Sequence, residues 1–474
     1  MLGRTRRVHF VGVGGIGMSG IAELLANLGC AVSGSDLVAS DVTERLTTLG
    51  VAVHLGHDAA HVGDADVVVV SSAVAADNPE VLDAERRDVP VIPRAEMLAE
   101  LMRLRYSIAV AGAHGKTSTT AMIALALEHA GLDPTAVIGG RLSALGGNAR
   151  LGQGEYMVAE ADESDQSFLR LTPTMAVLTN LDREHLESYG SFERLQEAFV
   201  DFANKVPFYG AVVACADDPV LASLLPRMTR RVLTYGFGPG ARDVLGSEVE
   251  LEAFSARCRV RFRAGRETDA WSTGALRLQV PGRHSLLNAL AAVAVGLEVG
   301  VSFDRLAGAL AEFAGVERRF QLKGEVAGVM VVDDYGHHPT EIAAVLAAAR
   351  AGFGRRVLVV FQPHRYTRTA QLAEEFGAAL AEADEVVLTD VYAAGEAPIP
   401  GATVDSIAES LRRRTTRPVH VVTPLSEVAP VVARLARPGD LVLTLGAGSI
   451  GGVGGRILAE LAGRGEEGLG HESR

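Results

Sequence analysis

Apolar runs followed by glycine turns and amphipathic stretches recur along the chain. The first run, Val8–Val13, has the pattern of a strand and precedes a glycine-rich turn and the helical stretch Met18–Leu28. A second strand is expected at Ala31–Gly34, and Val67–Val70 has the unbroken apolar character of a strand that is buried on both faces. The polar helical stretch Ala99–Arg105 closes this segment and is expected to act as a linker.

Two further segments repeat this alternation of strands and helices. The second segment begins with strand Ser107–Ala111 and helix Thr117–Ala130, and the alanine-rich helix Leu286–Gly296 ends it. Between about residues 244 and 280 the pattern changes to short alternating strands, which predicts a small antiparallel insert. The other strands expected in the two segments are Tyr156–Glu160, Met175–Thr179, Ala211–Ala214, Val329–Asp333, Arg356–Phe361, Glu385–Thr389, Val419–Val422 and Asp440–Leu445.

Strands that alternate with helices predict parallel sheets covered on both faces, so we expect an α/β fold with mainly parallel sheets. A chain of 474 residues is too long for one ordinary core, and the pattern predicts three domains. Their predicted boundaries are 1–105, 106–315 and 316–474. The polar tail Gly463–Arg474 is expected to be disordered.

Composition narrows the classes of function. The formal net charge is −13, and binding to a phosphate backbone normally needs a clustered basic face, so no nucleic-acid partner is expected. The three cysteines, Cys30, Cys215 and Cys258, lie far apart and form no C-x-x-C pair, as is usual in a reducing compartment. The chain has no run of about 18 apolar residues, so we expect a cytoplasmic protein without a membrane partner.

The first glycine turn has the pattern G-x-G-x-x-G between a strand and a helix. Gly14, Gly15, Ile16 and Gly17 belong to it and would present backbone amides to a diphosphate at the helix N-terminus, where the helix dipole favours negative charge. Asp36 follows the next strand, about where a carboxylate accepts a ribose hydroxyl. A nicotinamide or flavin dinucleotide, another nucleotide and a purely structural turn all fit this motif.

The second glycine turn, with the sequence GAHGKTSTT, also lies between a strand and a helix. In such a turn Lys116 would neutralise the β- and γ-phosphates of a triphosphate, and the Thr117 hydroxyl would ligate Mg²⁺. Val110 stands where the strict G-x-x-x-x-G-K-T pattern has its first glycine, and a structural turn is the alternative. The residues expected around the phosphates are Gly112, His114, Gly115, Lys116, Thr117 and Ser118.

Two acidic motifs follow strands of the second segment. AEADESD begins at Ala159 and includes Glu160, and TNLDREH ends at His185. Because the carboxyl ends of neighbouring parallel strands open onto one crevice, these side chains should lie near the second glycine turn. Carboxylate oxygens suit Mg²⁺, so we expect a magnesium site there, and a solvated charged surface is the alternative.

The third segment carries two motifs rich in basic side chains. The adjacent His337 and His338 follow two aspartates at a strand end, which fits either a metal site or a capped turn. No thiolate stands at suitable spacing, so a zinc site is not expected. His364, Arg365 and Arg368 fit bidentate capture of a carboxylate, and the solvated start of a helix is the alternative.

These motifs occur in the same order as in the Mur ligases, which the chain resembles from Gly12 to about Gly451. GRHSLLN at 282–288, GVERRF at 315–320 and FQPHRYTR at 361–368 add to the resemblance. The resemblance implies a Rossmann-like N-terminal domain for a UDP-sugar, a P-loop ATPase central domain, and a Rossmann-like C-terminal domain that binds the amino acid. The stretch 361–368 is similar to the branch of the family that adds L-alanine to UDP-N-acetylmuramate.

The resemblance also implies roles for single residues. Asn288 would lie against the adenine of ATP, and Arg319 and Asp334 would reach the nucleotide from the C-terminal domain. Magnesium would be held by Thr117, Glu160 and His185. The residues with an implied catalytic role are Lys116, Glu160, His185, Arg319, Tyr335 and His337. Those implied to bind the sugar nucleotide are Gly14, Gly15, Ile16, Gly17, Asp36, Ser71, Ser72 and His114, with residues 78–80 lining the same pocket. The amino-acid carboxylate would be held by His364, Arg365 and Arg368.

The implied activity is ATP-dependent amide formation through an acyl phosphate. Three alternatives remain at this stage: a recycling ligase that adds a peptide to the same sugar nucleotide, a nicotinamide-dependent dehydrogenase, and a non-catalytic nucleotide-binding module. Several Mur ligases carry a carbamylated lysine a short helix after the magnesium histidine. Here no lysine occurs between His185 and Lys205, so that modification is not expected. The oligomeric state, monomer or dimer, stays open.

Overall fold

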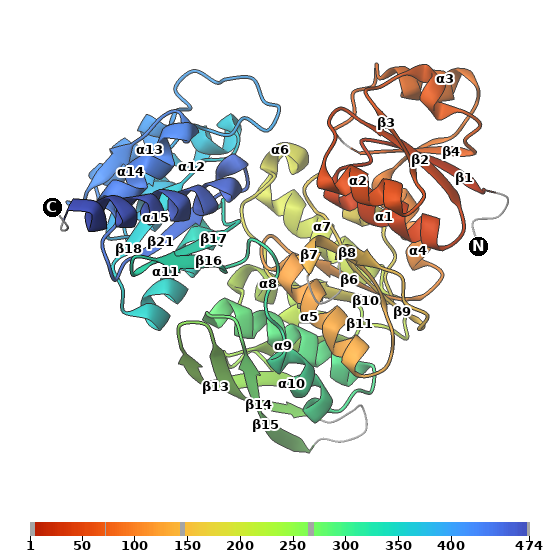
Figure 1. Ribbon diagram of the computed structural model, residues 1–474. Helices are drawn as coiled ribbons and strands as arrows, with labels where there is room; N and C mark the ends of the chain where they lie inside the picture. Colours follow the sequence, from red (N-terminus) through yellow and green to blue (C-terminus); the bar gives the residue numbers. More distant parts are fainter. Residues whose placement is uncertain (1–4, 72, 143–146, 264–269, 472–474) are drawn as a thin grey trace. The chain divides into compact units, whose positions relative to one another are not determined.

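The computed structural model describes residues 5–71, 73–142, 147–263 and 270–471 (Figure 1). Contacts group the chain into two compact units. Unit 1 comprises Met1–Glu248, Cys258–Arg277 and Leu287–Phe313, and unit 2 comprises Val249–Arg257, Leu278–Leu286 and Ala314–Arg474. The strands form three sheets, and together these make the expected three-domain α/β fold with mostly parallel strands.

The first sheet lies in unit 1 and has five parallel strands in the order β3-β2-β1-β4-β5. Its strands are β1 (Arg7–Val11), β2 (Ala31–Asp36), β3 (Ala52–Leu55), β4 (Val67–Val70) and β5 (Val91–Pro93). Its helices are α1 (Ile16–Asn27), α2 (Asp41–Thr48), α3 (Pro79–Arg86) and α4 (Arg94–Met102). Successive residues such as Val68 and Val69 are both buried, because a parallel sheet is covered on its two faces.

The second sheet has ten strands in the order β15-β14-β13-β12-β11-β10-β6-β9-β7-β8. Its strands are β6 (Tyr106–Ala111), β7 (Thr135–Leu142), β8 (Gly147–Arg150), β9 (Tyr156–Glu160), β10 (Met175–Leu178), β11 (Ala211–Cys215), β12 (Val232–Gly236), β13 (Val244–Leu251), β14 (Ala256–Arg263) and β15 (Trp271–Leu278). The helices of this part of the chain are α5 (Lys116–His129), α6 (Leu186–Tyr189), α7 (Phe192–Asn204), α8 (Pro219–Leu224), α9 (Arg283–Glu298) and α10 (Phe303–Ala311). In its centre β6 runs parallel to both β9 and β10, so these three strands end at the same edge.

The third sheet lies in unit 2 and has the order β16-β17-β21-β18-β19-β20. Its strands are β16 (Gln321–Val326), β17 (Val329–Asp334), β18 (Val357–Phe361), β19 (Glu385–Leu388), β20 (Val419–Val421) and β21 (Leu441–Leu445). Its helices are α11 (Pro339–Phe353), α12 (Tyr366–Leu380), α13 (Val404–Arg412), α14 (Val428–Leu435) and α15 (Val453–His471). The edge strand β16 pairs antiparallel with β17, and the other pairs are parallel.

Three expectations about the elements need correction. The small antiparallel insert expected between residues 244 and 280 contains the strands β13, β14 and β15, but these extend the second sheet, because β13 pairs parallel with β12. The stretch at Ala99 is not a polar linker, since α4 runs to Met102 and buries Leu98, Leu101 and Met102.

The tail is the third correction, because α15 continues through residues 463–471, which were expected to be disordered. Buried Val453, Ile457 and Leu461 recur at helical spacing and anchor the start of α15. Once a helix is formed, each added residue gains a hydrogen bond at a small ordering cost, so a polar sequence can continue it. Among the described residues, no helix is both long enough and apolar enough to cross a membrane.

Candidate active site

The second glycine turn joins β6 to α5 in unit 1. Gly112 and Gly115 have φ of 140° and 81°, which other residues rarely adopt. Space gives a second reason for glycine, because a Cβ on Gly115 would lie 2.7 Å from Oδ1 of Asn288. The structure therefore brings Asn288, which the resemblance implies at the adenine of ATP, to this turn. Thr117 and Ser118 lie in the first turn of α5, where backbone amides favour an anion.

Lys116 is the charged group of this turn. Its Nζ donates to the carbonyl oxygens of Gly112 (2.6 Å) and Ala113 (3.2 Å) and to Oε1 of Glu163 (2.8 Å). Burial acts to lower the pKa of Lys116, but the carboxylates of Glu163 and Asp162 outweigh it and leave the pKa above its ordinary value. Lys116 is therefore a fixed positive charge at neutral pH.

Oxygen donors suited to a cation lie beside Lys116. Glu160 ends β9 next to β6, and Oγ1 of Thr117 donates to its Oε2 over 3.3 Å. Glu163 follows three residues later; its Oε2 is buried and accepts no hydrogen bond from any residue that the structure describes. Burial raises the pKa of Glu163, against the effect of Lys116. A hydroxyl and two carboxylates with an unsatisfied oxygen fit a hard cation such as Mg²⁺.

His185 lies at the start of α6 with φ of 57°. Its Nε2 is 3.4 Å from Oε2 of Glu184, and its Nδ1 is 3.9 Å from Oε1 of Glu187. Within the described part of the chain, no hydrogen bond or ion pair joins His185 to Thr117 or Glu160. The structure therefore joins Thr117 and Glu160 of the predicted magnesium set by a hydrogen bond, and His185 acts from nearby to lower the pKa of Glu163.

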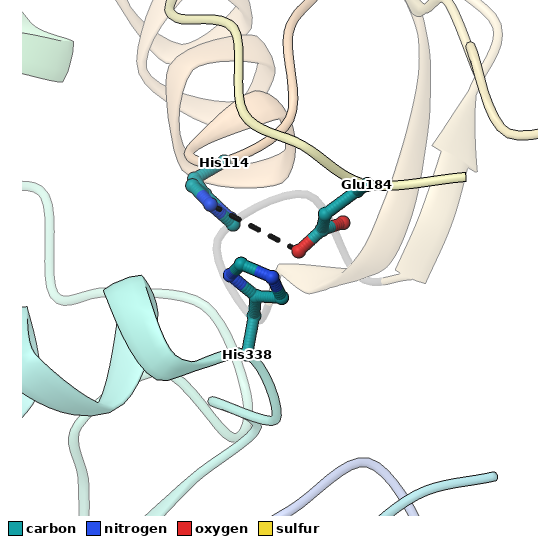
Figure 2. Close-up of side chains that lie close together, drawn as sticks. All are labelled: His114, Glu184 and His338. Carbon is teal, nitrogen blue, oxygen red and sulfur yellow. Dashed lines mark ion pairs between the residues drawn. The ribbon is translucent and has the colours of Figure 1, made fainter. Parts of the chain in front are cut away.

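His114 connects the second glycine turn to the TNLDREH loop. Its Nε2 lies 2.9 Å from Oδ2 of Asp182 and 3.9 Å from Oε1 of Glu184. Figure 2 shows the side chains of His114 and Glu184 directed toward one another. The backbone N–H of His114 also donates to Oδ1 of Asn180 (2.8 Å), and Oγ1 of Thr179 donates to its carbonyl oxygen (2.7 Å). The loop after β10 thus fixes the position of the glycine turn.

The first glycine turn has no lysine or arginine of its own. Gly14 donates its N–H to Oδ2 of Asp36 over 2.8 Å, so Asp36 holds the turn. Helix α1 begins with Gly15 as its N-cap, without a side-chain hydrogen bond at the cap, and Ile16 and Gly17 are its first residues. The amides of this N-terminus therefore remain suited to an anion from outside the turn.

Two serines were also expected at the sugar nucleotide. Ser71 directly follows β4, which neighbours β1 in the sheet, and its carbonyl oxygen accepts from the N–H of Val74. Ser72 lies outside the described residues.

The resemblance implies that Glu80 lines the sugar-nucleotide pocket, but the structure buries its side chain in a cluster of the first domain that the sequence did not reveal. Its side chain is 0% exposed, and it accepts hydrogen bonds from Ser35 (2.6 Å) and from the ring nitrogens of His57 (3.3 Å) and His61 (3.0 Å). Burial acts to raise the pKa of Glu80, but His9, Ser35 and His61 outweigh it and lower the pKa to about 2. The sequence signal is a lone glutamate at the start of α3 with three histidines elsewhere, which no motif connects.

In unit 2, Asp334 ends β17 and organises the turn that follows it. Its carboxylate accepts from the N–H groups of Phe320 (2.7 Å) and Gly336 (2.6 Å). Burial raises the pKa of Asp334 to about 6, against the charge of Arg319. Arg319 lies over the Tyr335 ring at 5.2 Å and is 3.4 Å from Glu341, so its guanidinium is held within the same group of residues.

The neighbouring Arg318 has a structural role. It donates to Oδ2 of Asp333 (3.0 Å) and to the carbonyl oxygen of Gly446 (2.6 Å), which ties β17 to the end of β21.

Glu341 is the residue here that sequence analysis missed. Its Oε2 accepts from the N–H groups of His337 (3.0 Å) and His338 (3.3 Å), so the two-histidine stretch is the capped start of α11.

His364 and its neighbours form a basic group at the start of α12. The His364 ring stacks on Tyr392 at 5.5 Å, meets the His337 ring at 5.4 Å, and lies 3.4 Å from Nη1 of Arg368. Burial, together with His337, Arg368 and Arg365, lowers the pKa of His364 to about 3, so its ring is neutral at physiological pH. Arg365 is the N-cap of α12 with φ of 71°. The structure thus brings together His337, His364 and Arg368, with Arg365 adjacent.

Comparisons with known proteins match this chain to one family. Models described as Mur ligase family, catalytic domain; Mur ligase middle domain; and Mur ligase, glutamate ligase domain match residues 7–106, 110–296 and 318–448.

Similar proteins cover nearly the whole chain. The chain is 53% identical to a UDP-N-acetylmuramate–L-alanine ligase of Geobacter sp. (strain M21), over 97% of this chain and 99% of that one. It is 55% identical to the ligase of the same name from Anaeromyxobacter dehalogenans (strain 2CP-C), over 97% and 98%. A crystal structure of UDP-N-acetylmuramate-alanine ligase from Thermotoga maritima matches with a TM-score of 0.80 and 31% identity, over 97% of this chain and 99% of that one.

Proposed function

Because the chain belongs to the Mur ligase family, we propose that it joins L-alanine to the lactyl carboxylate of UDP-N-acetylmuramate at the expense of ATP. This reaction supplies a peptidoglycan precursor. We propose that it runs in the cytoplasm, where ATP is abundant. The three cysteines are free thiols, which fits a reducing compartment. The observation that carries the proposal is the partly buried Lys116, held by Glu163 beside Thr117 and Glu160.

The chemistry requires activation of the acid. A carboxylate oxygen is a poor leaving group, and phosphorylation by ATP turns it into one that an amine can displace through a tetrahedral intermediate. Phosphoryl transfer depends mainly on positioning and on neutralisation of charge. Lys116 is preorganised for this task, since three acceptors fix its ammonium group before any substrate binds.

Thr117, Glu160 and Glu163 are the residues that would hold Mg²⁺. Bound there, Mg²⁺ would neutralise phosphate oxygens of ATP. Glu163 also holds the ammonium group of Lys116 in place, which keeps the charge close to the turn. Asn288, beside Gly115, would bind the adenine of the same nucleotide.

The basic group of unit 2 would bind the amino acid. Arg365 and Arg368 provide the charges for its carboxylate, with the fork geometry that suits two oxygens. A neutral His364 can accept a hydrogen bond and adds no positive charge that would repel the amino group. His337, held by Glu341, completes this set.

The test is phosphate release by the full chain with ATP, Mg²⁺ and UDP-N-acetylmuramate, and with L-alanine, glycine, L-serine or a tripeptide in turn. We expect release to depend on all substrates and to be fastest with L-alanine. The margin over glycine should be modest, because one methylene group changes binding by ~1–3 kcal/mol. No release with L-alanine, or a higher kcat/KM with the tripeptide, would refute the proposal.

A further inference from the structure

Arg94 occupies an unusual position for an arginine. It is the first residue of α4, directly after Pro93, so its positive charge lies at the positive end of the helix dipole. Arginine is unfavourable there unless another interaction offsets the repulsion. Its side chain is 26% exposed, so burial of the apolar stem alone does not explain why an arginine stands at this position.

The guanidinium of Arg94 lies between two segments of unit 1. Its Nη2 is 3.5 Å from Oδ2 of Asp162, which belongs to the AEADESD loop after β9. Its Nη1 lies against Gly17, the second residue of α1, and a Cβ on Gly17 would overlap it. One side chain therefore reaches both the first glycine turn and the acidic loop of the central domain.

Asp162 does not use the full capacity of this guanidinium. The hydrogen bond to Asp162 is long, both side chains are partly exposed, and such pairs contribute little stability. A guanidinium has five N–H donors. In the part of the chain that the structure describes, Asp162 is the residue to which the Arg94 side chain donates.

The first glycine turn contains no cationic side chain. The second turn has Lys116 within it, whereas residues 12–17 are glycines and apolar residues. A diphosphate at the start of α1 would meet backbone amides alone unless a neighbouring segment provides a charge. Arg94 is that neighbouring charge, and the lack of a side chain on Gly17 leaves the space that it occupies.

We propose that Arg94 binds the diphosphate of the sugar nucleotide at the first glycine turn, and that Gly17 is glycine to admit its guanidinium. This inference rests on the proposed function for the identity of the ligand. Asp162 keeps the guanidinium directed toward the turn in the absence of ligand. Arg94 thus does for the diphosphate in the first domain what Lys116 does for the triphosphate in the second.

The alternative is that Arg94 only ties α4 to the central domain. The chain offers a matched control for that role, because Glu96 on the same helix is 3.4 Å from Arg170 of the short helix Ser167–Arg170. This second pair also joins α4 to the segment after β9, and both of its side chains are about half exposed. Among the described residues, neither side chain of this pair has a hydrogen bond or ion pair to the first glycine turn.

The experiment measures binding by calorimetry on the full chain, with UDP, UDP-N-acetylmuramate and ATP as separate ligands. For Arg94→Ala we expect Kd for UDP and for UDP-N-acetylmuramate to rise alike, by roughly ten- to a hundredfold, because a charge-assisted hydrogen bond pair is lost. Kd for ATP should change less than about twofold. For Arg94→Lys, Kd for UDP and for UDP-N-acetylmuramate should lie between the values of the alanine variant and of wild type. This variant replaces Arg94→Ala in the test if the alanine variant does not fold. Glu96→Gln should leave all three Kd values unchanged.

Three results would overturn the inference. The first is unchanged UDP binding by Arg94→Ala. The second is a loss of affinity for UDP-N-acetylmuramate alone, because this would assign Arg94 to the lactyl carboxylate. An equal loss in Glu96→Gln is the third, since it would reduce Arg94 to a tie between segments. Binding needs no turnover, so failure of the wild-type chain to release phosphate with L-alanine would refute the proposed function and leave this test intact.

Discussion

Two buried glutamates, one near each glycine turn, have opposite properties. Glu80 in the first domain has hydrogen bonds on both carboxylate oxygens, from Ser35 and His57 on one and from His61 on the other, and these help to lower its pKa to about 2. Glu163 in the central domain has Lys116 on one oxygen and no partner among the described residues on the other, and burial raises its pKa.

The contrast distinguishes a buried carboxylate that stabilises the fold from one that is suited to bind a ligand. A buried carboxylate whose lone pairs are satisfied is a stable part of the fold, whereas one with an unsatisfied oxygen carries a desolvation cost that a ligand can remove. Glu80 therefore belongs to the framework of the first domain. Glu163 and its partner Lys116 belong to the site that we propose for nucleotide and cation.

The largest effect is expected for Lys116→Ala, which removes the cation of the central site. Turnover should fall by ~10²–10³, the usual loss for one preorganised charge in a transition state. The fold should survive, because Glu163 can take up a proton when its partner is lost. Phosphate release measures the turnover and thermal unfolding measures the stability of the fold. Lys323→Ala, at an exposed position, is the control. More than a tenth of wild-type activity in Lys116→Ala would contradict the assigned role.

A smaller effect is expected for Glu163→Gln. Glutamine keeps the size of the side chain and a neutral acceptor for Lys116, but it loses the negative charge that suits a cation. We expect kcat to fall by roughly tenfold and the concentration of Mg²⁺ for half-maximal rate to rise, since carboxylates are the preferred ligands. Titration of Mg²⁺ in the phosphate assay measures this, and the exposed Glu197→Gln should behave as wild type. An unchanged Mg²⁺ requirement would make Glu163 a structural residue like Glu80.

The smallest effect on turnover is expected at Glu80, where the prediction concerns stability. Because folding lowers its pKa from about 4.5 to about 2, the Glu80 carboxylate contributes stability above pH 4.5, and this is lost as the pH falls toward 2. The contribution is at most about 3 kcal/mol, the value of the full shift. In urea unfolding between pH 5 and pH 2.5, Glu80→Gln should lose stability less steeply than wild type. Glu85→Gln, on the exposed side of the same helix, should keep the wild-type slope; an unchanged slope in Glu80→Gln would contradict the prediction.

Local pattern was sufficient for the strands and turns that build the site. β9 has the predicted bounds Tyr156–Glu160, and α5 begins at Lys116, one residue before the predicted helix. Both follow from apolar runs and glycine positions, which act over a few residues. The strands β3 and β5 were missed because they are short and, unlike the equally short β4 with its four valines, are only partly buried.

Contacts between distant segments were beyond such reasoning. The acidic motif was recognised, but nothing in AEADESD distinguishes Glu160 beside Thr117 from Glu163 beside Lys116, since both roles depend on how the loop turns after β9. Arg94 and Asp162 are 68 residues apart in sequence. The Glu80 cluster likewise assembles side chains from β1, β2 and the turn after β3, and no spacing rule connects them.

The pairing of β9 with β6 sets Val110 opposite Glu160. Side chains along a strand alternate between the two faces, so a shift of the pairing by one residue would place Ala159 or Ala161 where Glu160 now meets Thr117. Met157, Val158 and Ala159, directly before Glu160, are buried, and a shift would drive that carboxylate toward the apolar side. The proposed cation site thus depends on the same apolar residues that align the central strands. Core substitutions that loosen this alignment should abolish activity before they unfold the protein.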